Sequence, residues 1–363
     1  MKPFFVFLVL YITLCLYACD NSSYDSKYII SIDKKDTSCF KSDTLVLNIK
    51  DYRNNIKYKW ENNNPDIADL IDNYKSVIII GKKVGKDTIR LSGTDGDNLF
   101  NTKCIVSVLQ DTIKILAIGN SFSENAIEQN LYELAENCKI PLIIGNMYIG
   151  GCSLETHLTN AINNYPNYEY RKIVNGKKYK YNATSLFYAI KDENWNYISF
   201  QQVSYLAGTY KSYVKSLPQL VEYIKKNATN PKLKLVLHQT WAYAKNATLP
   251  YYINQKTMYD SIVSAVNKAS ILTDINIIVP TGTAIQNART SFIGDKFNSD
   301  GVHLEGTYGK YTAACTWFEK ILGINVIGNK YSPNLDEKVK QIVQKAAHFA
   351  IQEPSKITDL SYQ

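Results

Sequence analysis

Residues Ile113 to Glu124 read IKILAIGNSFSE. The apolar run that ends at Gly119 predicts a buried strand, and the polar residues after it can begin a helix. Ser121 therefore lies where a predicted strand ends and a predicted helix begins. Two roles are open to this serine. With Glu124 it has the spacing of a capping box, which satisfies free backbone N–H groups, and a serine in this place can also be a nucleophile.

The alternation of strand and helix patterns continues from this stretch toward the C-terminus. Five βα units follow one another, with the strand runs IKILAIG, PLIIGNMYI, WNYISFQQV, LKLVLHQTW and INIIVPTGTAI. This pattern predicts an α/β fold with a doubly wound, five-stranded parallel sheet of flavodoxin-like type and helices on both faces. In such folds ligands bind beyond the carboxyl ends of the strands. That edge is where Ser121 is expected.

Two further segments belong to this part of the chain. The insertion YEYRKIVNGKKYKYNAT carries Asn175-Gly176 between alternating residues, which predicts a β-hairpin. We expect this hairpin, residues 168–181, to cover the cleft. Apolar residues at helical spacing predict a last helix from about Asp336 to Gln352.

The region before this alternation, residues 28–110, has a different period. Short alternating runs such as TLVLNI, SVIIIG, DTIRLSG and CIVSVL recur about every ten residues, which predicts an all-β sandwich. The stretch from Trp60 to Ala68, followed by GKDTIRL, resembles the bacterial Ig-like domains of surface proteins. We expect a spacer, with glycan binding as the alternative. Cys39 and Cys104 lie near its two ends and could be bridged or free.

The N-terminus reads MKPFFVFLVLYITLCLYAC. One lysine followed by an apolar run too short to span a bilayer predicts a secretion signal in residues 1–19. Its end, LYAC, resembles the lipobox of bacterial lipoproteins, which implies a lipidated Cys19 and a tether in residues 20–27. The folded part is then expected outside the cytoplasm, anchored at the outer membrane or cell surface. An uncleaved anchor or an ordinary signal peptide is the alternative.

Composition and charge limit the kinds of molecule that the protein is expected to bind. The chain has 363 residues and a formal net charge of +8, but its lysines are scattered and interleaved with acidic residues. This is typical of a solvated surface and does not indicate nucleic-acid binding. The cysteines show no CxxC pair and no zinc-ligand spacing. The sequence does not indicate an oligomeric state.

A second chemical motif lies near the C-terminus, where Asp300-Gly-Val-His303 follows a glycine-rich polar loop. An aspartate three residues before a histidine can orient the imidazole from the same turn. The other ring nitrogen is then free to take a proton from a serine. Ser121, His303 and Asp300 are therefore a candidate catalytic triad.

Residues 112–352 resemble the SGNH hydrolases, also named the GDSL family. The motifs are GNSFSENAIEQNLYELA, YIGGCSLETH, SFQQVS and SDGVHLEGTYGKYTAA, and they look like a lipoprotein branch of that family. The resemblance implies Ser121 as nucleophile, His303 as general base and acid, and Asp300 as its orienting partner. It implies neither a metal nor an organic cofactor, and it leaves residues 353–363 as a tail.

The resemblance has two departures. The aspartate that usually precedes the nucleophile is Asn120 here, which leaves the triad intact. The GxND block after the third strand is replaced by FQQVS. We expect Gln202, or else Gln201, to supply the oxyanion-hole amide, together with the backbone N–H groups of Ser121 and Gly151. The missing block keeps open a non-catalytic, glycan-binding lipoprotein with a degenerate hydrolase fold.

Residues after the fourth strand are expected to line the site. Gln239 and Trp241 would contact substrate, and the aromatic face of Trp241 could stack on a sugar ring. His157 would help to position the oxyanion loop, whereas His238 and His348 are expected to be structural. These expectations favour a serine esterase that removes short acyl groups, acetyl first, from an acylated glycan. That substrate follows from context and not from residue spacing.

Overall fold

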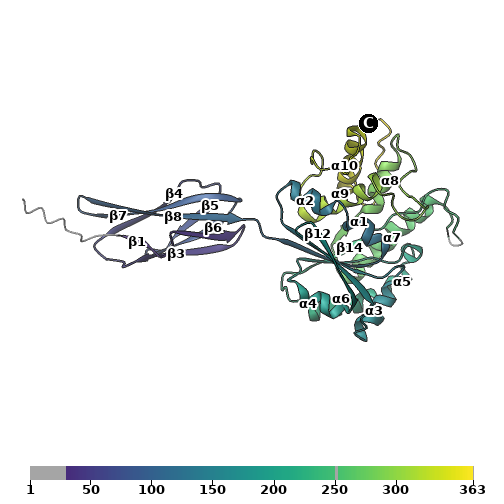
Figure 1. Cartoon of the computed structure of the whole chain (residues 1–363), viewed down its shortest axis with the longest axis horizontal. Coiled ribbons are helices and arrows are strands. Elements are labelled where there is room, and N and C mark those ends of the chain that lie inside the picture. The colour runs from purple at the N-terminus through teal and green to yellow at the C-terminus, as the bar shows by residue number, and fades with distance from the viewer. Residues whose placement is uncertain (1–29, 250–251, 363) are drawn as a thin grey trace, which may run out of the picture. The chain divides into compact units, whose positions relative to one another are not determined.

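The computed structural model describes residues 30–249 and 252–362. The chain divides into two compact units, Met1–Leu109 and Gln110–Gln363, and each unit is described here by itself (Figure 1). The predicted signal peptide, the lipidated Cys19 and the tether lie outside the described residues. Within the ranges that are described, no helix has the length and apolar content needed to cross a membrane.

The N-terminal unit is all-β and consists of two four-stranded sheets. One has the order β1-β3-β6-β5, with bounds Ser31–Ile32, Thr44–Lys50, Ser76–Gly81 and Ala68–Asp72. The other has the order β2-β8-β7-β4, with bounds Asp36–Phe40, Asn98–Leu109, Gly85–Asp95 and Lys57–Asn62. Apolar side chains of both sheets form one buried cluster, so the sheets pack face to face around a shared core.

Cys39 and Cys104 lie in this core as free thiols. Cys39 on β2 pairs with Val108 on β8, so Cys104 lies four positions away along β8. At about 3.3 Å per residue this offset is roughly 13 Å. Cα atoms joined by a disulfide are rarely more than about 7 Å apart. Of the two alternatives left open by the sequence, the structure shows the unbridged one.

The C-terminal unit contains a seven-stranded mixed sheet with the order β12-β11-β10-β9-β13-β14-β15. The bounds in that order are Lys177–Thr184, Tyr168–Val174, Leu142–Tyr148, Ile113–Gly119, Tyr197–Phe200, Lys234–His238 and Ile277–Val279. Five neighbouring strands, β10, β9, β13, β14 and β15, pair in parallel. Strand β11 pairs antiparallel with β10, and β12 pairs antiparallel with β11. The expected five-stranded parallel sheet is therefore too small, because the inserted hairpin adds two antiparallel strands.

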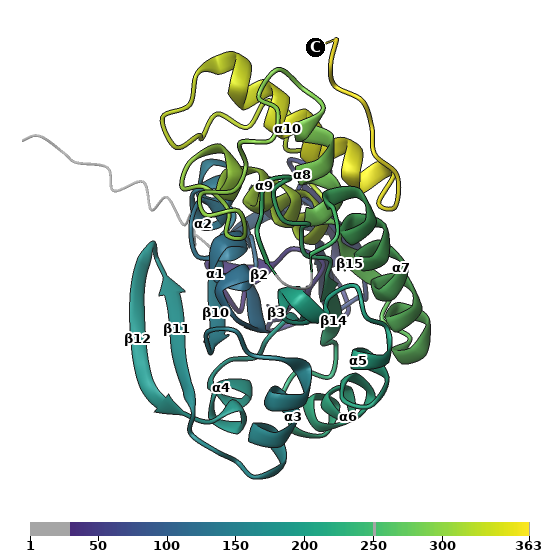
Figure 2. The same cartoon turned by 90° about the vertical axis from the view of Figure 1, so that its right-hand side faces the viewer.

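The hairpin turns at Asn175 and Gly176, which have φ values of 50° and 73°. Positive φ at both central residues is the requirement of a type I′ turn, so the Asn-Gly prediction is confirmed. The expectation that the hairpin covers the cleft is wrong. Its first strand, β11, pairs with residues Ile143 to Tyr148 of β10 and continues the sheet sideways (Figure 2).

Helices cover both faces of the sheet (Figure 2). On one face are α1, α2, α8, α9 and α10, with bounds Ser121–Ile127, Leu131–Asn137, Thr281–Arg289, Tyr308–Leu322 and Glu337–Gln352. On the other are α3, α4, α5, α6 and α7, with bounds Leu154–Ile162, Leu186–Asp192, Lys211–Val214, Leu217–Asn227 and Gln255–Thr273. A short 3-10 helix, η1, spans Ser204–Leu206. The predicted last helix is confirmed as α10.

Strand β9 shows why its sequence is a continuous apolar run. Ile115 and Ala117 pack into the cluster of the first face, whereas Leu116 and Ile118 pack into the cluster of the second. Successive side chains of a strand point to opposite faces, so a strand buried on both needs apolar residues at every position. The connections from β9 and from its neighbour β10 cross to opposite sides of the sheet. The carboxyl ends of β9 and β13 are therefore a topological switch point, where such folds bind ligands.

Candidate active site

Ser121 is the first residue of α1 and follows β9 after one intervening residue. The residue that caps this helix is Asn120, whose side-chain oxygen accepts a 3.0 Å hydrogen bond from the backbone N–H of Phe122. The capping box expected between Ser121 and Glu124 is therefore wrong. Glu124 instead forms an ion pair with Arg171 of β11, at 3.0 Å. Because Asn120 supplies the cap, the hydroxyl of Ser121 is not used in starting the helix.

The hydroxyl of Ser121 contacts His303, which lies 182 residues further along the chain. The distance from Ser121 Oγ to His303 Nε2 is 2.9 Å. The other ring nitrogen, Nδ1, lies 2.7 Å from Oδ2 of Asp300. The structure therefore brings the three side chains of the predicted triad into one hydrogen-bonded chain.

The protonation of Asp300 sets the direction of these hydrogen bonds. Partial burial raises the pKa of its carboxyl, but hydrogen bonds from the His303 ring and from the backbone N–H groups of His303 and Val302 outweigh burial and lower that pKa to about 2. Asp300 is thus a carboxylate and accepts from Nδ1–H of His303. Nε2 is then the acceptor for the Ser121 hydroxyl, which is the tautomer that a general base requires.

The loop that carries Asp300 and His303 is a tight turn. Oδ1 of Asp300 accepts from the backbone N–H groups of Val302 at 2.9 Å and of His303 at 2.7 Å. Gly301 between them has a φ of +83°, a region that side chains other than glycine rarely adopt. The short DxxH spacing therefore fixes both the backbone of the turn and the orientation of the imidazole.

Trp241 joins this loop to the helix that carries the serine. Its indole N–H donates a 2.9 Å hydrogen bond to the carbonyl oxygen of Val302. Its ring stacks on Phe122, with centroids 4.1 Å apart and planes within 6°. Trp241 is fully buried, so the expected role as a stacking surface for a sugar is wrong. The next residue of the loop after His303 is also fixed, because the backbone N–H of Leu304 donates to Asn125 of α1 at 2.9 Å.

The second loop beside Ser121 follows β10 and contains Gly151, which has a φ of +63°. Asn120 holds this loop, because its side-chain amide donates a 3.0 Å hydrogen bond to the carbonyl oxygen of Cys152. No hydrogen bond among the described residues uses the backbone N–H of Ser121 or of Gly151. Both N–H groups are therefore available to a ligand, as the predicted oxyanion hole requires.

The two glutamines after β13 do not have the role that the sequence suggested. Gln202 accepts from the backbone N–H groups of Leu154 at 3.0 Å and Val203 at 2.9 Å. Its amide nitrogen donates to Oγ of Ser212 at 2.9 Å and to the Ser212 carbonyl at 3.2 Å. Both amide hydrogens are thus occupied, and Gln202 cannot be an oxyanion donor in this arrangement. Its oxygen instead fixes Leu154, three residues after Gly151.

Gln201 is likewise part of a buried network. Its amide nitrogen donates to Oδ1 of Asn120 at 2.8 Å, and its oxygen lies 2.8 Å from Nδ1 of His238. The other nitrogen of His238 lies 3.0 Å from the hydroxyl of Thr281. Gln201 therefore supports the residue that precedes the serine, and Gln202 supports the loop that carries Gly151. The two side chains therefore help to position the predicted oxyanion donors and do not themselves donate to an oxyanion.

Comparison with known proteins places the C-terminal unit in a family. The family described as "Domain of unknown function (DUF4886)" matches residues 114–350. The chain belongs to the DUF4886 family. A crystal structure of a DUF4886 family protein from Bacteroides uniformis is 54% identical, with a TM-score of 0.68 and a match that covers 69% of this chain and 98% of that one.

More distant structures are also similar to this DUF4886 protein. A catalytic mutant of an acetylxylan esterase from Geobacillus stearothermophilus is 12% identical, with a TM-score of 0.40, and the match covers 61% of this chain and 97% of that one. A candidate acylhydrolase from Bacteroides fragilis is 12% identical, with a TM-score of 0.36 and coverage of 58% and 85%. No curated protein matches the sequence.

The surroundings of four other residues in the DUF4886 domain bear on the roles expected for them. Gln239 is buried, accepts from Thr283 and donates to the carbonyl of Pro354, so a contact with substrate is not supported. His157 is fully buried in α3, and burial lowers its pKa to about 3. Its Nδ1 lies 3.0 Å from the Tyr168 hydroxyl and 3.5 Å from Sγ of Cys152.

His157 therefore cannot contact substrate, but it does contact a residue of the Gly151 loop. The structural roles expected for His238 and His348 agree with their surroundings. Burial lowers the pKa of His238 to about 3, and Nδ1 of His348 lies 2.6 Å from Glu319.

In the DUF4886 domain, Asn120 has a structural role that was not predicted from the sequence. This one side chain contacts Phe122, Cys152 and Gln201, and so links the three loops at the carboxyl ends of β9, β10 and β13. The preference of asparagine for helix N-caps was a usable signal. Within the described part of the chain, no three His, Cys, Asp or Glu side chains are grouped closely enough to hold a metal ion.

Proposed function

We propose that this protein is a serine esterase that works through an acyl-enzyme on Ser121. The observation that carries the proposal is the hydrogen-bonded chain from Asp300 to His303, at 2.7 Å, and from His303 to Ser121, at 2.9 Å. A carboxylate, an imidazole and a hydroxyl in this order are the groups that activate a serine as a nucleophile.

In the first half of the reaction, Oγ of Ser121 attacks the carbonyl carbon of the ester while Nε2 of His303 takes the hydroxyl proton. The negative charge that develops on the carbonyl oxygen is stabilised by the backbone N–H groups of Ser121 and Gly151. When the tetrahedral intermediate collapses, His303 gives the proton to the leaving alcohol oxygen. The acyl group is then bonded to Ser121.

In the second half, water attacks the acyl carbon and His303 accepts a proton from that water. Collapse of this intermediate breaks the bond to Oγ, and His303 returns the proton to Ser121. The carboxylic acid leaves, and the enzyme is restored. Asp300 stays ionised throughout and stabilises the imidazolium.

The proposed oxyanion hole consists of two backbone N–H groups. Ser121 N–H lies at the start of α1, where the helix dipole favours negative charge. Gly151 N–H is held by the contacts of its neighbours with Asn120 and Gln202. One oxyanion-hole donor typically contributes on the order of 100-fold to turnover.

For the substrate we propose short acyl groups, with acetyl first, on glycans. The support is the secretion signal and lipobox-like LYAC motif of the N-terminus, which would place the enzyme outside the cytoplasm with a lipid on Cys19. The all-β N-terminal unit would then be an Ig-like spacer between the anchor and the SGNH-like domain. An enzyme held in this way meets polymers at the cell surface.

Hydrolysis of p-nitrophenyl acetate by wild type and Ser121→Ala tests the proposal. Turnover by wild type that falls to background in Ser121→Ala supports the esterase. Ser264→Ala, at an exposed position of α7, is the matched control and is expected to keep wild-type turnover. Equal rates in wild type and Ser121→Ala contradict the proposal.

Two other outcomes identify the alternatives. Absence of turnover with acetyl, butyryl and longer p-nitrophenyl esters, in a folded wild-type protein, favours the non-catalytic glycan-binding lipoprotein. Turnover that rises steadily with acyl length favours a lipase or thioesterase. The acyl-length profile is therefore measured together with the serine variant.

A further inference from the structure

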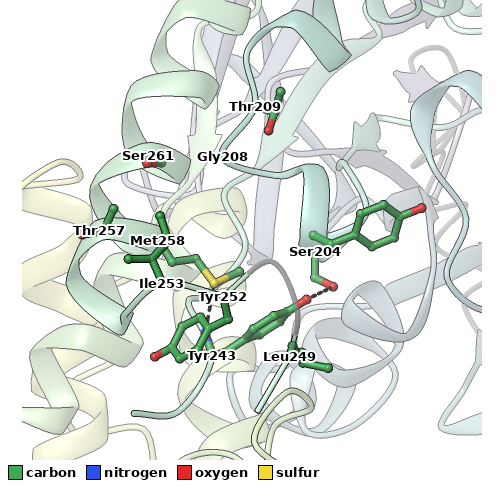
Figure 3. Close-up of a pocket in the computed structure, with 11 residues that line it drawn as sticks. Ser204, Gly208, Thr209, Tyr243, Leu249, Tyr252, Ile253, Thr257, Met258 and Ser261 are labelled. Atoms are coloured by element: carbon green, nitrogen blue, oxygen red, sulfur yellow. Dashed lines mark hydrogen bonds between the residues drawn. The ribbon is translucent and has the colours of Figure 1, made fainter. Parts of the chain in front are cut away.

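A cavity of about 670 Å³ lies in the C-terminal unit beyond the carboxyl ends of β13 and β14 (Figure 3). We name it the β13–β14 cavity. Its walls come from three segments: the loop after β13, the loop after β14 and the first turns of α7. The lining residues are Ser204, Tyr205, Gly208, Thr209, Tyr243, Leu249, Tyr252, Ile253, Thr257, Met258 and Ser261.

The cavity is close to the triad along two short connections. Gln201 contacts Asn120, the residue before Ser121, and Ser204 follows Gln201 by three residues. Because one residue spans at most about 3.6 Å, Ser204 lies within roughly 11 Å of Gln201 along the chain. On the other side, Tyr243 follows Trp241 by two residues, and Trp241 stacks on Phe122. Both connections lead to the neighbours of the nucleophile.

The oxyanion loop and the cavity lie on opposite sides of Ser121 in the sheet. Gly151 follows β10, which flanks β9 on one side, whereas β13 and β14 follow on the other. Adjacent strands are about 4.8 Å apart. An ester carbonyl that points toward Gly151 therefore directs one of its two substituents toward the cavity.

The lining of the cavity is uncharged and rich in hydroxyl groups. Seven of the eleven lining residues carry a hydroxyl group, and none carries a charge. Figure 3 shows Thr257, Met258 and Ser261 on one wall and Ser204 on the facing one, with the ring of Tyr243 reaching toward Ser204. The Tyr243 hydroxyl donates to Ser204 Oγ at 2.8 Å, and the two tyrosine rings are 5.8 Å apart.

These walls discriminate between ligand classes. A charged ligand would find no opposite charge among the lining residues. A long acyl chain could contact the apolar part of this lining but would make no hydrogen bond with its hydroxyl groups. An acetyl group is far smaller than 670 Å³. A neutral sugar ring has apolar C–H faces that can stack on the accessible rings of Tyr205 and Tyr252, and an equatorial rim of hydroxyls that can bond to the hydroxyl groups of the lining.

We propose that the β13–β14 cavity binds uncharged sugar units of the substrate, on the alcohol side of the ester. The inference rests on the proposed function and adds to it the position and the charge class of the glycan. Tyr205 and Ile253 are exposed by 55% and 80%, so a longer oligosaccharide can leave the cavity past their side chains.

The test fills the cavity from an exposed position of α7. Thr257→Trp places an indole among the lining residues, and the backbone N–H of residue 257 can still donate to its helix cap, Asn254. Lys256→Trp is the matched control, because Lys256 is exposed on the same turn and does not line the cavity. Both variants are assayed with p-nitrophenyl acetate and with partially O-acetylated xylotetraose.

We expect Thr257→Trp to lower kcat/KM for acetylated xylotetraose by about tenfold or more relative to its kcat/KM for p-nitrophenyl acetate, mainly through KM. Lys256→Trp is expected to match wild type with both substrates. Undiminished cleavage of acetylated xylotetraose by Thr257→Trp overturns the proposal. So does a wild-type preference for O-acetylated oligogalacturonate over acetylated xylotetraose, or a loss in Thr257→Trp that is confined to p-nitrophenyl decanoate.

If the protein is not an esterase, the sugar site is tested by binding alone. If wild type hydrolyses none of these esters, the cavity is tested by calorimetric titration with unacetylated xylotetraose. Binding that Thr257→Trp abolishes and Lys256→Trp keeps supports the sugar site without an esterase. No binding by wild type overturns the sugar site as well.

Discussion

The indole N–H of Trp241 donates a hydrogen bond to the carbonyl oxygen of Val302, the residue that precedes His303. The same ring stacks on Phe122, the residue that follows Ser121. One buried side chain therefore contacts the chain neighbours of both the proposed base and the proposed nucleophile. The 2.9 Å contact between His303 and Ser121 depends on two loops that Trp241 holds together.

Trp241→Phe is expected to lower kcat for p-nitrophenyl acetate by about tenfold with little change in KM. Phenylalanine keeps an aromatic contact with Phe122 but removes one of the two donors to the Val302 carbonyl, since the side-chain amide of Asn298 still donates to it at 2.8 Å. The loss of this one hydrogen bond lowers the unfolding free energy by about 0.5–1.5 kcal/mol. Steady-state kinetics and urea unfolding measure the two effects. Trp195→Phe is the control, because Trp195 is buried on the other face and donates to the Ala189 carbonyl. An equal fall of kcat in both variants would show that only stability is involved.

Asp300→Asn is expected to lower kcat on the order of 10⁴-fold while the fold is kept. The amide cannot stabilise an imidazolium, and its N–H₂ group can donate to Nδ1, which would put the ring proton on Nε2 and face it toward Ser121. The rate with p-nitrophenyl acetate and the circular dichroism spectrum give the two readouts. A folded variant that retains more than about a tenth of wild-type kcat would count against the triad.

The titration of Asp300 gives a prediction for stability against pH. Its pKa is lowered from 3.8 to about 2 in the folded protein, so its hydrogen bonds contribute fully above about pH 4 to 5 and are lost as the pH falls toward 2. The difference in unfolding free energy between wild type and Asp300→Asn should therefore shrink from pH 5 to pH 2. The effect is small, because the Asp300 side chain is 55% exposed and solvent screens it. A constant difference over this range, measured by urea unfolding, contradicts the assignment.

Gln202→Ala is expected to lower kcat by about tenfold with KM almost unchanged. The variant removes the acceptor of the Leu154 N–H, which loosens the loop that carries Gly151, and complete loss of an oxyanion donor costs on the order of 100-fold. Ser212→Ala removes a partner at the amide end of Gln202, together with hydrogen bonds to the carbonyls of Leu206 and Thr209, but leaves the Gln202 oxygen on Leu154. Its kcat should therefore stay within about twofold of wild type. If Ser212→Ala lowers kcat as much as Gln202→Ala, the effect comes from general destabilisation and not from the Gly151 loop.

Local patterns were sufficient for much of the fold. The apolar run before Ser121 is a strand because both its faces are buried, and Asn175-Gly176 turns a hairpin because both residues adopt positive φ. What the local pattern lacked was the long-range pairing of that hairpin with β10. The alternation of the hairpin residues is the same whether it covers a cleft or extends a sheet, so the sequence could not decide between the two.

In the candidate site, too, local patterns predicted some residues correctly and long-range packing decided the others. The DxxH spacing is a local feature, and it led to Asp300 and His303 beside Ser121. Trp241 and Gln239 were misplaced because residues that follow a strand buried on both faces can turn into a helix layer as easily as into the cleft. His157 could have been placed correctly, since the buried residues of α3 recur at helical spacing: Leu154, His157, Leu158 and Ala161.

Strand β12 has a consequence for solubility. It forms one border of the seven-stranded sheet, and all its residues except the last are exposed. An unpaired border of this kind is a template on which another copy of the chain can add a strand and begin to aggregate. Lys177, Lys178 and Lys180 lie on it. Lys178 and Lys180 are paired with Glu128 and Glu169, but two copies that met edge to edge would still bring their lysines together. The inserted hairpin thus enlarges the sheet and also ends it in a form that resists polymerisation.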